Sequence, residues 1–184
     1  MSRSFNGTTD VITYTDVAGL ALAEPFTMAA VVNTSSIAAG RRTIISDGDR
    51  GVANCGWQFN MSAANLDFTA IGLWGGAATA TTALATNTWY GVAVTKPTAG
   101  TSMTFYRFTF STQAVASEVV NMFNSGQNAG TRIAKIGAMH NTSIDTELWS
   151  GNIARVGVWM GQVLTATDLT AWWTCGLAQP HALT

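Results

Sequence analysis

The chain has 184 residues, of which 47% are hydrophobic and only 10% are charged, and its formal net charge is −1. Soluble domains average about 25% charged residues, so this chain replaces charge with neutral residues that suit an all-β protein. Its nine Lys and Arg residues form no cluster, which argues against a nucleic-acid partner, because phosphate backbones require basic patches. The length fits one domain, and we expect a single domain over residues 1–184.

Most of the predicted elements are β-strands, because apolar and polar residues alternate in short segments. Residues 102–110 carry large apolar groups on both faces, so we expect a strand that is covered on both sides. We expect a loop with a weak strand in residues 74–86, and irregular chain in residues 114–130 and 139–146. The last strand has one residue out of phase, which predicts a β-bulge near residues 152–153. The predicted strands are residues 2–6, 11–15, 26–33, 42–47, 57–61, 66–73, 88–95, 102–110, 132–138 and 154–160.

A short helix follows the last strand. Thr165 is a good N-cap, and Asp168 stands three residues later, where its carboxylate can reach back to a free backbone N–H. Leu169, Trp172 and Trp173 share one helix face, and we expect this Trp pair to belong to the core. A strand that leads into such a helix indicates the closing strand and plug of an all-β, two-sheet antiparallel β-sandwich with one short C-terminal helix.

Three pieces of the sequence resemble the laminin-G-like, concanavalin A-like lectin/glucanase superfamily. Residues 5–7 (FNG) and 26–28 (FTM) resemble its opening strands, and residues 89–95 (WYGVAVT) resemble its W-x-x-V-A-x-T strand. Residues 151–156 (GNIARV) and 164–165 (LT) resemble its ending. The resemblance implies a jelly roll over almost the whole chain, and it places Trp89 in the core strand. These motifs specify a fold and hardly any activity.

The resemblance also carries expectations about location and partners. Members that start with such an N-terminus resemble virion proteins of tailed bacteriophages, made in the host cytoplasm. They imply binding to capsid or tail proteins, and to other copies in a homo-oligomer. The low net charge fits a surface that neighbours cover. We see no secretory signal and no apolar run long enough for a membrane span, so we expect no membrane partner.

One departure from the family concerns a hairpin. Many members follow the Trp strand with a Tyr-Val-Asp-Gly hairpin, whereas this chain has Tyr106-Arg107-Phe108 at the matching place. The resemblance therefore does not extend to any ligand surface beside that hairpin.

Carboxylates give little sign of catalysis. Glycosidases of this superfamily use a Glu-x-Asp-x-Glu strand, in which paired carboxylates act as nucleophile and general acid. The nearest match is Asp145-Thr146-Glu147, with Ser143 in place of the first Glu. We interpret Asp145 and Glu147 as a solvated loop and expect no enzyme, and a residual glycoside hydrolase remains as an alternative.

Two candidate ligand sites remain open. Asp47 and Asp49 could supply oxygen ligands to Ca²⁺, although calcium takes six to eight oxygens and a plain turn explains the same sequence. Trp74 lies in a Gly-rich segment and is our candidate for an exposed contact with a glycan or another subunit. No cofactor other than Ca²⁺ is indicated.

The remaining reactive side chains form no recognisable group. Cys55 and Cys175 stand far apart, and we expect two buried free thiols, with a disulfide as the alternative. His140 and His181 have no Cys pair near them in the sequence, which argues against zinc.

Two functional hypotheses therefore stand beside the residual glycoside hydrolase. The first is a non-catalytic virion protein, either a head decoration or a tail-associated protein that binds coat subunits. The alternative is a carbohydrate-binding, lectin-like module that attaches to host glycans.

Overall fold

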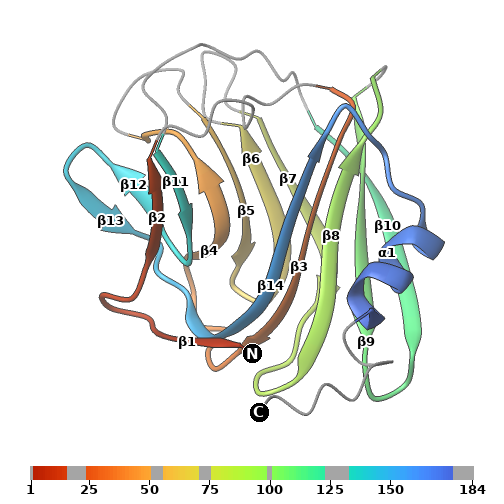
Figure 1. Cartoon of the computed structure of the whole chain (residues 1–184), viewed down its shortest axis with the longest axis horizontal. Coiled ribbons are helices and arrows are strands. Elements are labelled where there is room, and N and C mark those ends of the chain that lie inside the picture. The colour runs from red at the N-terminus through yellow and green to blue at the C-terminus, as the bar shows by residue number, and fades with distance from the viewer. Residues whose placement is uncertain are drawn as a thin grey trace.

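Two six-stranded antiparallel sheets face each other in the computed structural model, which describes residues 2–15, 24–50, 56–70, 76–98, 101–122 and 133–175 (Figure 1). Sheet A has the order β1 (Arg3–Asn6), β14 (Ser150–Met160), β3 (Phe26–Thr34), β8 (Trp89–Lys96), β9 (Ser102–Thr109) and β10 (Ala114–Asn121). Sheet B has the order β2 (Ile12–Thr15), β11 (Ile133–Ile136), β4 (Arg41–Asp47), β5 (Trp57–Ser62), β6 (Asn65–Ala70) and β7 (Gly76–Ala83). A small hairpin, β12 (Met139–Asn141) and β13 (Ile144–Thr146), and one helix, α1 (Ala166–Thr174), complete the fold.

The core lies between the two sheets, as the alternation of apolar residues predicted. Trp57 and Trp149 are fully buried in it, and Phe26 packs on Phe68 with ring centroids 5.3 Å apart. Each strand sends every second side chain inward, because successive residues of a strand point to opposite faces. The largest buried side chains of this core are Phe5, Phe26, Met28, Ile44, Trp57, Phe59, Met61, Leu66, Phe68, Phe105 and Trp149.

Two segments that we predicted as loops contain the strands β10 and the β12–β13 hairpin, and the segment in which we expected a loop with a weak strand contains β7. β7 lies in the Gly/Ala/Thr-rich segment, where the inward residues Ala78 and Ala80 are too small to produce a strong hydrophobic period. β10 is an edge strand whose valines point to both faces, which hides the alternation. The β12–β13 hairpin occupies the polar segment before β14. Polar and small residues therefore concealed strands that neighbouring strands stabilise.

The helix does not plug the sandwich, so that prediction is wrong. Figure 1 shows α1 on the side of sheet A that faces away from sheet B. Leu169 and Trp173 are buried there, and Trp173 stacks on Phe108 of β9 with ring centroids 5.7 Å apart. Trp89 and Trp172 pack against the same cluster but stay partly exposed, so only Trp173 of the expected core tryptophans is fully buried. The outer faces of β3, β8 and β9 are apolar, and this is why the helix lies on them.

Because α1 covers the outer face of β9, the prediction that this strand is covered on both sides is confirmed. Met103 and Phe105 point into the core between the sheets, whereas Phe108 points to the helix side. Gly91 of β8 lies directly beneath the helix, where an added Cβ would stand 2.5 Å from Cδ2 of Trp173. The close approach of α1 to sheet A thus depends on a glycine.

The predicted capping box is confirmed. The backbone N–H of Asp168 donates to Oγ1 of Thr165 at 3.2 Å, and the backbone N–H of Thr165 donates to Oδ2 of Asp168 at 2.9 Å. The Thr165 hydroxyl also donates to that carboxylate. The hydrogen bond from this hydroxyl, and to a smaller extent the one from the Thr165 backbone N–H, lowers the pKa of Asp168 from its usual value. The cap fixes where the chain leaves sheet A and the helix begins.

The bulge in β14 lies one residue later than predicted. Ile153 pairs with Val32 and Arg155 pairs with Val31, so Ala154 is the extra residue. Ala154 is exposed, whereas Ile153 belongs to the core. The bulge therefore lets Ile153 and the residues after Ala154 both contribute apolar side chains to the same core face.

The two long sides of the sandwich differ. On one side, Glu118 of β10 reaches across to β7 and accepts hydrogen bonds from the backbone N–H groups of Thr81 at 2.9 Å and Thr82 at 3.2 Å, and from both hydroxyls. Burial raises the pKa of Glu118, but these hydrogen bonds outweigh it, so the pKa of this carboxyl is lowered overall. On the other side of the sandwich, β1 and β14 are separated from β2 and β11 by a cleft.

Candidate functional site

A polar patch covers the face of sheet B that points away from the core. In β5, Trp57, Phe59 and Met61 point inward, so Gln58 and Asn60 point outward. Register then places their cross-strand neighbours on the same outer face. We define the polar patch of sheet B as Thr43, Ser46, Gln58, Asn60, Asp67, Thr69 and Thr79.

The two amides at the centre of the patch are buried without protein partners. Gln58 and Asn60 are both 0% exposed, yet none of their side-chain nitrogen and oxygen atoms has a hydrogen-bond partner among the residues that the structure describes. A buried amide without a partner costs about 1–3 kcal/mol. Because most buried polar groups are paired, two adjacent exceptions on one strand require an explanation. They are the atoms that a polar ligand could satisfy.

Asp67 holds the neighbouring part of the patch in place. Its Oδ1 accepts from the Thr79 hydroxyl at 2.6 Å, and its Oδ2 accepts from Arg41 Nε at 3.1 Å and from the Thr69 hydroxyl at 3.2 Å. The Asp67 side chain is fully buried, whereas that of Arg41 is 28% exposed. Thr79 is exposed, so the patch meets solvent at its β7 end, whereas Gln58, Asn60 and Asp67 are 0% exposed.

The patch offers recognition chemistry. A side-chain amide presents two donors and one acceptor oxygen, which can pair with two neighbouring hydroxyl groups. Gln58 and Asn60 lie two residues apart on one strand, about 6.6 Å at about 3.3 Å per residue, so each amide could pair with a different part of one sugar. Both side chains are 0% exposed, so a sugar could reach them only if the patch opens. We predicted the alternation of Gln58 and Asn60 in a half-buried strand but expected nothing of their function. Their burial is a tertiary effect that the period of one strand does not reveal.

An ionic network fixes the β12–β13 hairpin beside the patch. Lys135 Nζ lies 2.7 Å from Asp145 Oδ1 and also donates to the Thr13 hydroxyl at 3.3 Å. His140 Nδ1 lies 3.3 Å from the same Asp145 oxygen, and its Nε2 lies 3.7 Å from Asp49 Oδ2. The hairpin is therefore held at β11 and at the end of β4, where Figure 1 shows it.

The predicted solvated loop at Asp145 and Glu147 is wrong. Asp145 pairs with Lys135 and His140, whereas Glu147 pairs with Arg50. Each carboxylate is thus directed to its own cation. The sequence pattern did not reveal these ion pairs, because Lys135 and Arg50 come from other segments of the chain. A pair of carboxylates that flank a sugar bond would need to face a common space.

Asp47 and Asp49 do not form a clear calcium site. Asp49 Oδ1 accepts from the backbone N–H of Thr142 at 2.6 Å, and Asp47 is opposite the core residue Trp57 in the β4–β5 register. Within the described ranges, no three His, Cys, Asp or Glu side chains gather in a group that could hold a metal ion. Calcium binding by Asp47 and Asp49 therefore stays a prediction.

Several predicted residues fall outside the described ranges. Trp74, Cys55 and His181 are among the residues that the structure does not describe, so the predictions for them stand as they were. Cys175 is a free thiol as expected, but it is exposed, so the expectation of a buried thiol there is wrong. The prediction for Cys55 is not tested.

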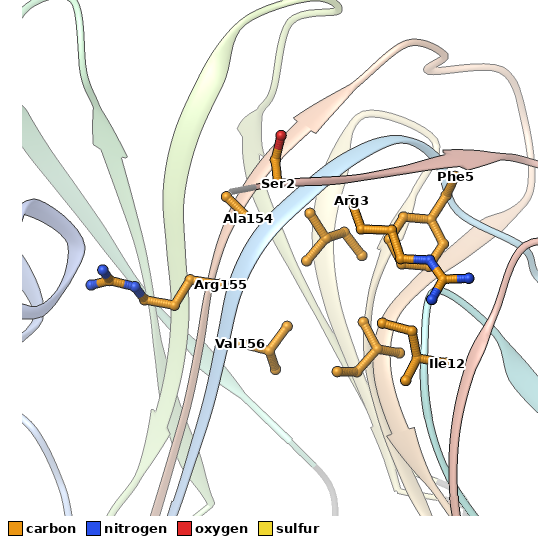
Figure 2. A pocket seen from close by; sticks show the side chains of 9 residues that line it. Ser2, Arg3, Phe5, Ile12, Ala154, Arg155 and Val156 are labelled. Carbon is orange, nitrogen blue, oxygen red and sulfur yellow. The ribbon is translucent and has the colours of Figure 1, made fainter. Parts of the chain in front are cut away.

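The cleft at the side of the sandwich opposite Glu118 has different chemistry. Its volume is 260 Å³, and Phe5, Ile12 and Val156 are among its apolar walls. Figure 2 shows the Arg3 guanidinium next to Phe5, with Cζ 5.5 Å from the ring centroid, and Arg155 extending away from the cleft. Arg155 instead lies over Trp172 of α1. Among the described residues that line this cleft, none is a carboxylate.

Two twisted antiparallel sheets with this strand order define a concanavalin A-like jelly roll of the laminin-G type, which confirms the fold that the sequence resemblance implied. In the described part of the chain, no helix has the length and apolar character of a transmembrane segment.

Comparison with solved structures gives several similar domains. The CBM40 of the Ruminococcus gnavus IT-sialidase, solved with α2,3-sialyllactose, is 13% identical with a TM-score of 0.67 and covers 94% of this chain and 97% of that chain. The LG1–3 region of the laminin α2 chain is 10% identical with a TM-score of 0.61 and covers 88% and 32%. The enzymatically active domain of tailspike protein 2 from bacteriophage CBA120 is 14% identical with a TM-score of 0.59 and covers 92% and 27%. No protein-family model and no curated protein sequence matches the chain.

Proposed function

We propose that this protein is a carbohydrate-binding jelly roll that contacts a sugar through the polar patch of sheet B. The observation that carries the proposal is the pair of buried amides, Gln58 and Asn60, whose polar atoms have no partner among the described residues. Hydroxyl groups of a sugar would offset the desolvation of both amides. The similarity to a carbohydrate-binding module over nearly the full length of both chains supports the same proposal.

The direct test is a glycan array with purified protein, in the presence and absence of calcium. We expect binding to at least one glycan class, and we expect Asn60→Leu to weaken it at least about tenfold, the equivalent of one lost hydrogen bond of 1.4 kcal/mol. Gln162→Met is the matched control, because it removes an exposed amide far along the chain, before α1. An array with no hits under either condition would exclude the carbohydrate proposal.

We further propose that binding occurs without hydrolysis. Glu147 and Asp145 are each held by a cation, and neither is directed to the other. Incubation with a bound glycan should release no product. If product appears and Glu147→Gln abolishes it, the protein is a glycoside hydrolase.

A second candidate function is that of a virion component, either a head decoration or a tail-associated protein. The similarity to part of a bacteriophage tailspike and the low net charge favour it. Such a protein would carry its sugar-binding face to the host surface and would bind coat or tail proteins through other faces. Particles purified from a lysate should contain the chain in fixed stoichiometry, and its absence from washed particles would remove this candidate.

A further inference from the structure

We propose that two copies of this chain associate through their β10 strands, edge to edge and antiparallel, so that sheet A continues into a second copy. This inference does not rest on sugar binding. It rests on the edges of the two sheets, on the side chains of β10 and on the register that a two-fold axis imposes.

The two six-stranded sheets have four edges among the described strands, and these edges differ in how readily another strand could pair with them. β1 and β2 have only four residues each. β7 is longer, but Glu118 accepts hydrogen bonds from two of its backbone N–H groups, at Thr81 and Thr82. β10 has eight residues, and its neighbour among the described strands is β9 on one side alone. It is therefore the long edge with backbone groups free to pair.

β10 lacks the devices that normally prevent edge pairing. It contains no Pro and no Lys, and all eight residues pair with β9 without a register shift. Its one charged residue, Glu118, is already bound to β7. Monomeric proteins protect long edges with charges, prolines or bulges, because unpaired edges associate. This described strand has no proline and no bulge, and its one charge is directed to β7, which points to an edge that another strand covers.

The outward face of β10 is apolar where a partner would lie. Val119 is 67% exposed and Val115 is 39% exposed, and both stand on the side of sheet A that carries α1. Beside Val115, a groove of 480 Å³ runs along α1, lined otherwise by Ala166, Thr167, Thr170, Ala171 and Thr174. None of these side chains is charged.

The sequence of β10 suits a second copy of itself. In a two-fold antiparallel pair centred on Ser117, Val115 stands opposite Val119 of the second copy, and Val119 stands opposite its Val115. Glu118 then faces Ala116, so no like charges oppose each other. A pair centred on Glu118 would bring the two carboxylates together. The register is therefore specified by one charge and two valines, and it places Val119 of the second copy beside the groove along α1.

Sedimentation velocity and light scattering test the association. We expect a monomer–dimer equilibrium for the wild-type chain, and we expect Val119→Lys to raise the dissociation constant at least about tenfold, because each dimer contains the substitution twice. Val163→Lys is the matched control, since Val163 is 44% exposed but lies outside β10. It should leave the equilibrium unchanged, and circular dichroism should show both variants folded.

Cysteine trapping tests the register independently. In a background with Cys55→Ser and Cys175→Ser, Ser117→Cys should form a covalent dimer under mild oxidation, because opposed residues have Cα atoms about 4.5–5.5 Å apart, within disulfide reach. Asn121→Cys should not, since the two copies of that residue would be about 26 Å apart at about 3.3 Å per residue. A wild-type chain that stays monomeric at its highest soluble concentration overturns the proposal, as does equal crosslinking at both positions.

Discussion

Replacing the two buried amides by apolar side chains of similar size should make the protein more stable and remove its sugar binding. Gln58→Met and Asn60→Leu each delete polar atoms that have no partner among the described residues. A buried unpaired polar group costs about 1–3 kcal/mol, so each substitution should raise the free energy of unfolding by about that amount. In a chain of this length, about 1 kcal/mol shifts Tm by about 2–4 °C, which predicts a gain on the order of 2–10 °C.

The assay is urea unfolding of each variant beside scanning calorimetry, followed by glycan binding on the same samples. Gln162→Met is the control, because an exposed amide should change stability by less than about 0.5 kcal/mol. Gain of stability with loss of function is expected where a site keeps polar groups for a ligand. If Gln58→Met lowers the free energy of unfolding by about 1 kcal/mol or more, the amide is paired in the native protein and the reasoning fails.

Three further predictions concern the helix and the closed side of the sandwich. Gly91→Ala should lower the free energy of unfolding by about 1–3 kcal/mol, because the new Cβ would meet Trp173. Urea unfolding should show a smaller cost of Gly91→Ala in a Trp173→Leu background. An equal cost in both backgrounds would contradict that contact. Thr165→Ala should cost about 1 kcal/mol in the same assay through loss of the N-cap, whereas Thr165→Ser should cost little. The lowered pKa of Glu118 means that its contribution is present above its unfolded value of 4.5 and is lost as pH falls through the lower folded pKa. Glu118→Gln should therefore flatten the acid limb of a stability-versus-pH curve, and an unchanged limb would show that the contact with β7 contributes nothing.

The sequence was most informative where large apolar residues alternate. Trp57, Phe59 and Met61 gave the correct strand and the correct inward face, and Thr165 with Asp168 gave the start of the helix. These signals are local, because one strand period or one capping box lies within a few residues. β7 was predicted only as a weak strand within a loop, because Ala and Thr differ little in hydrophobicity.

The position of the helix and the candidate site depended on distant contacts instead. Trp173 could have filled the mouth of the sandwich or covered a sheet, and the choice was made by Phe108 and the glycine at position 91. The alternation in β5 predicts that Gln58 and Asn60 lie on the solvated side of a half-buried strand. They are buried instead, because their burial depends on tertiary structure that the strand period does not reveal. The partners of Asp145 and Glu147 likewise come from other segments, so a search for adjacent acidic residues could not find them.

The hydrogen bonds from β7 to Glu118 make the two long sides of the molecule unequal in their resistance to opening. Backbone amides of β9, those of β10 that pair with β9, and those of Thr81 and Thr82 should exchange slowly with deuterated solvent, whereas those of the four-residue strands β1 and β2 should exchange first. Thermal fluctuations of this jelly roll would then separate the two sheets at the cleft beside Phe5, while the contact between Glu118 and β7 keeps them together on the opposite side.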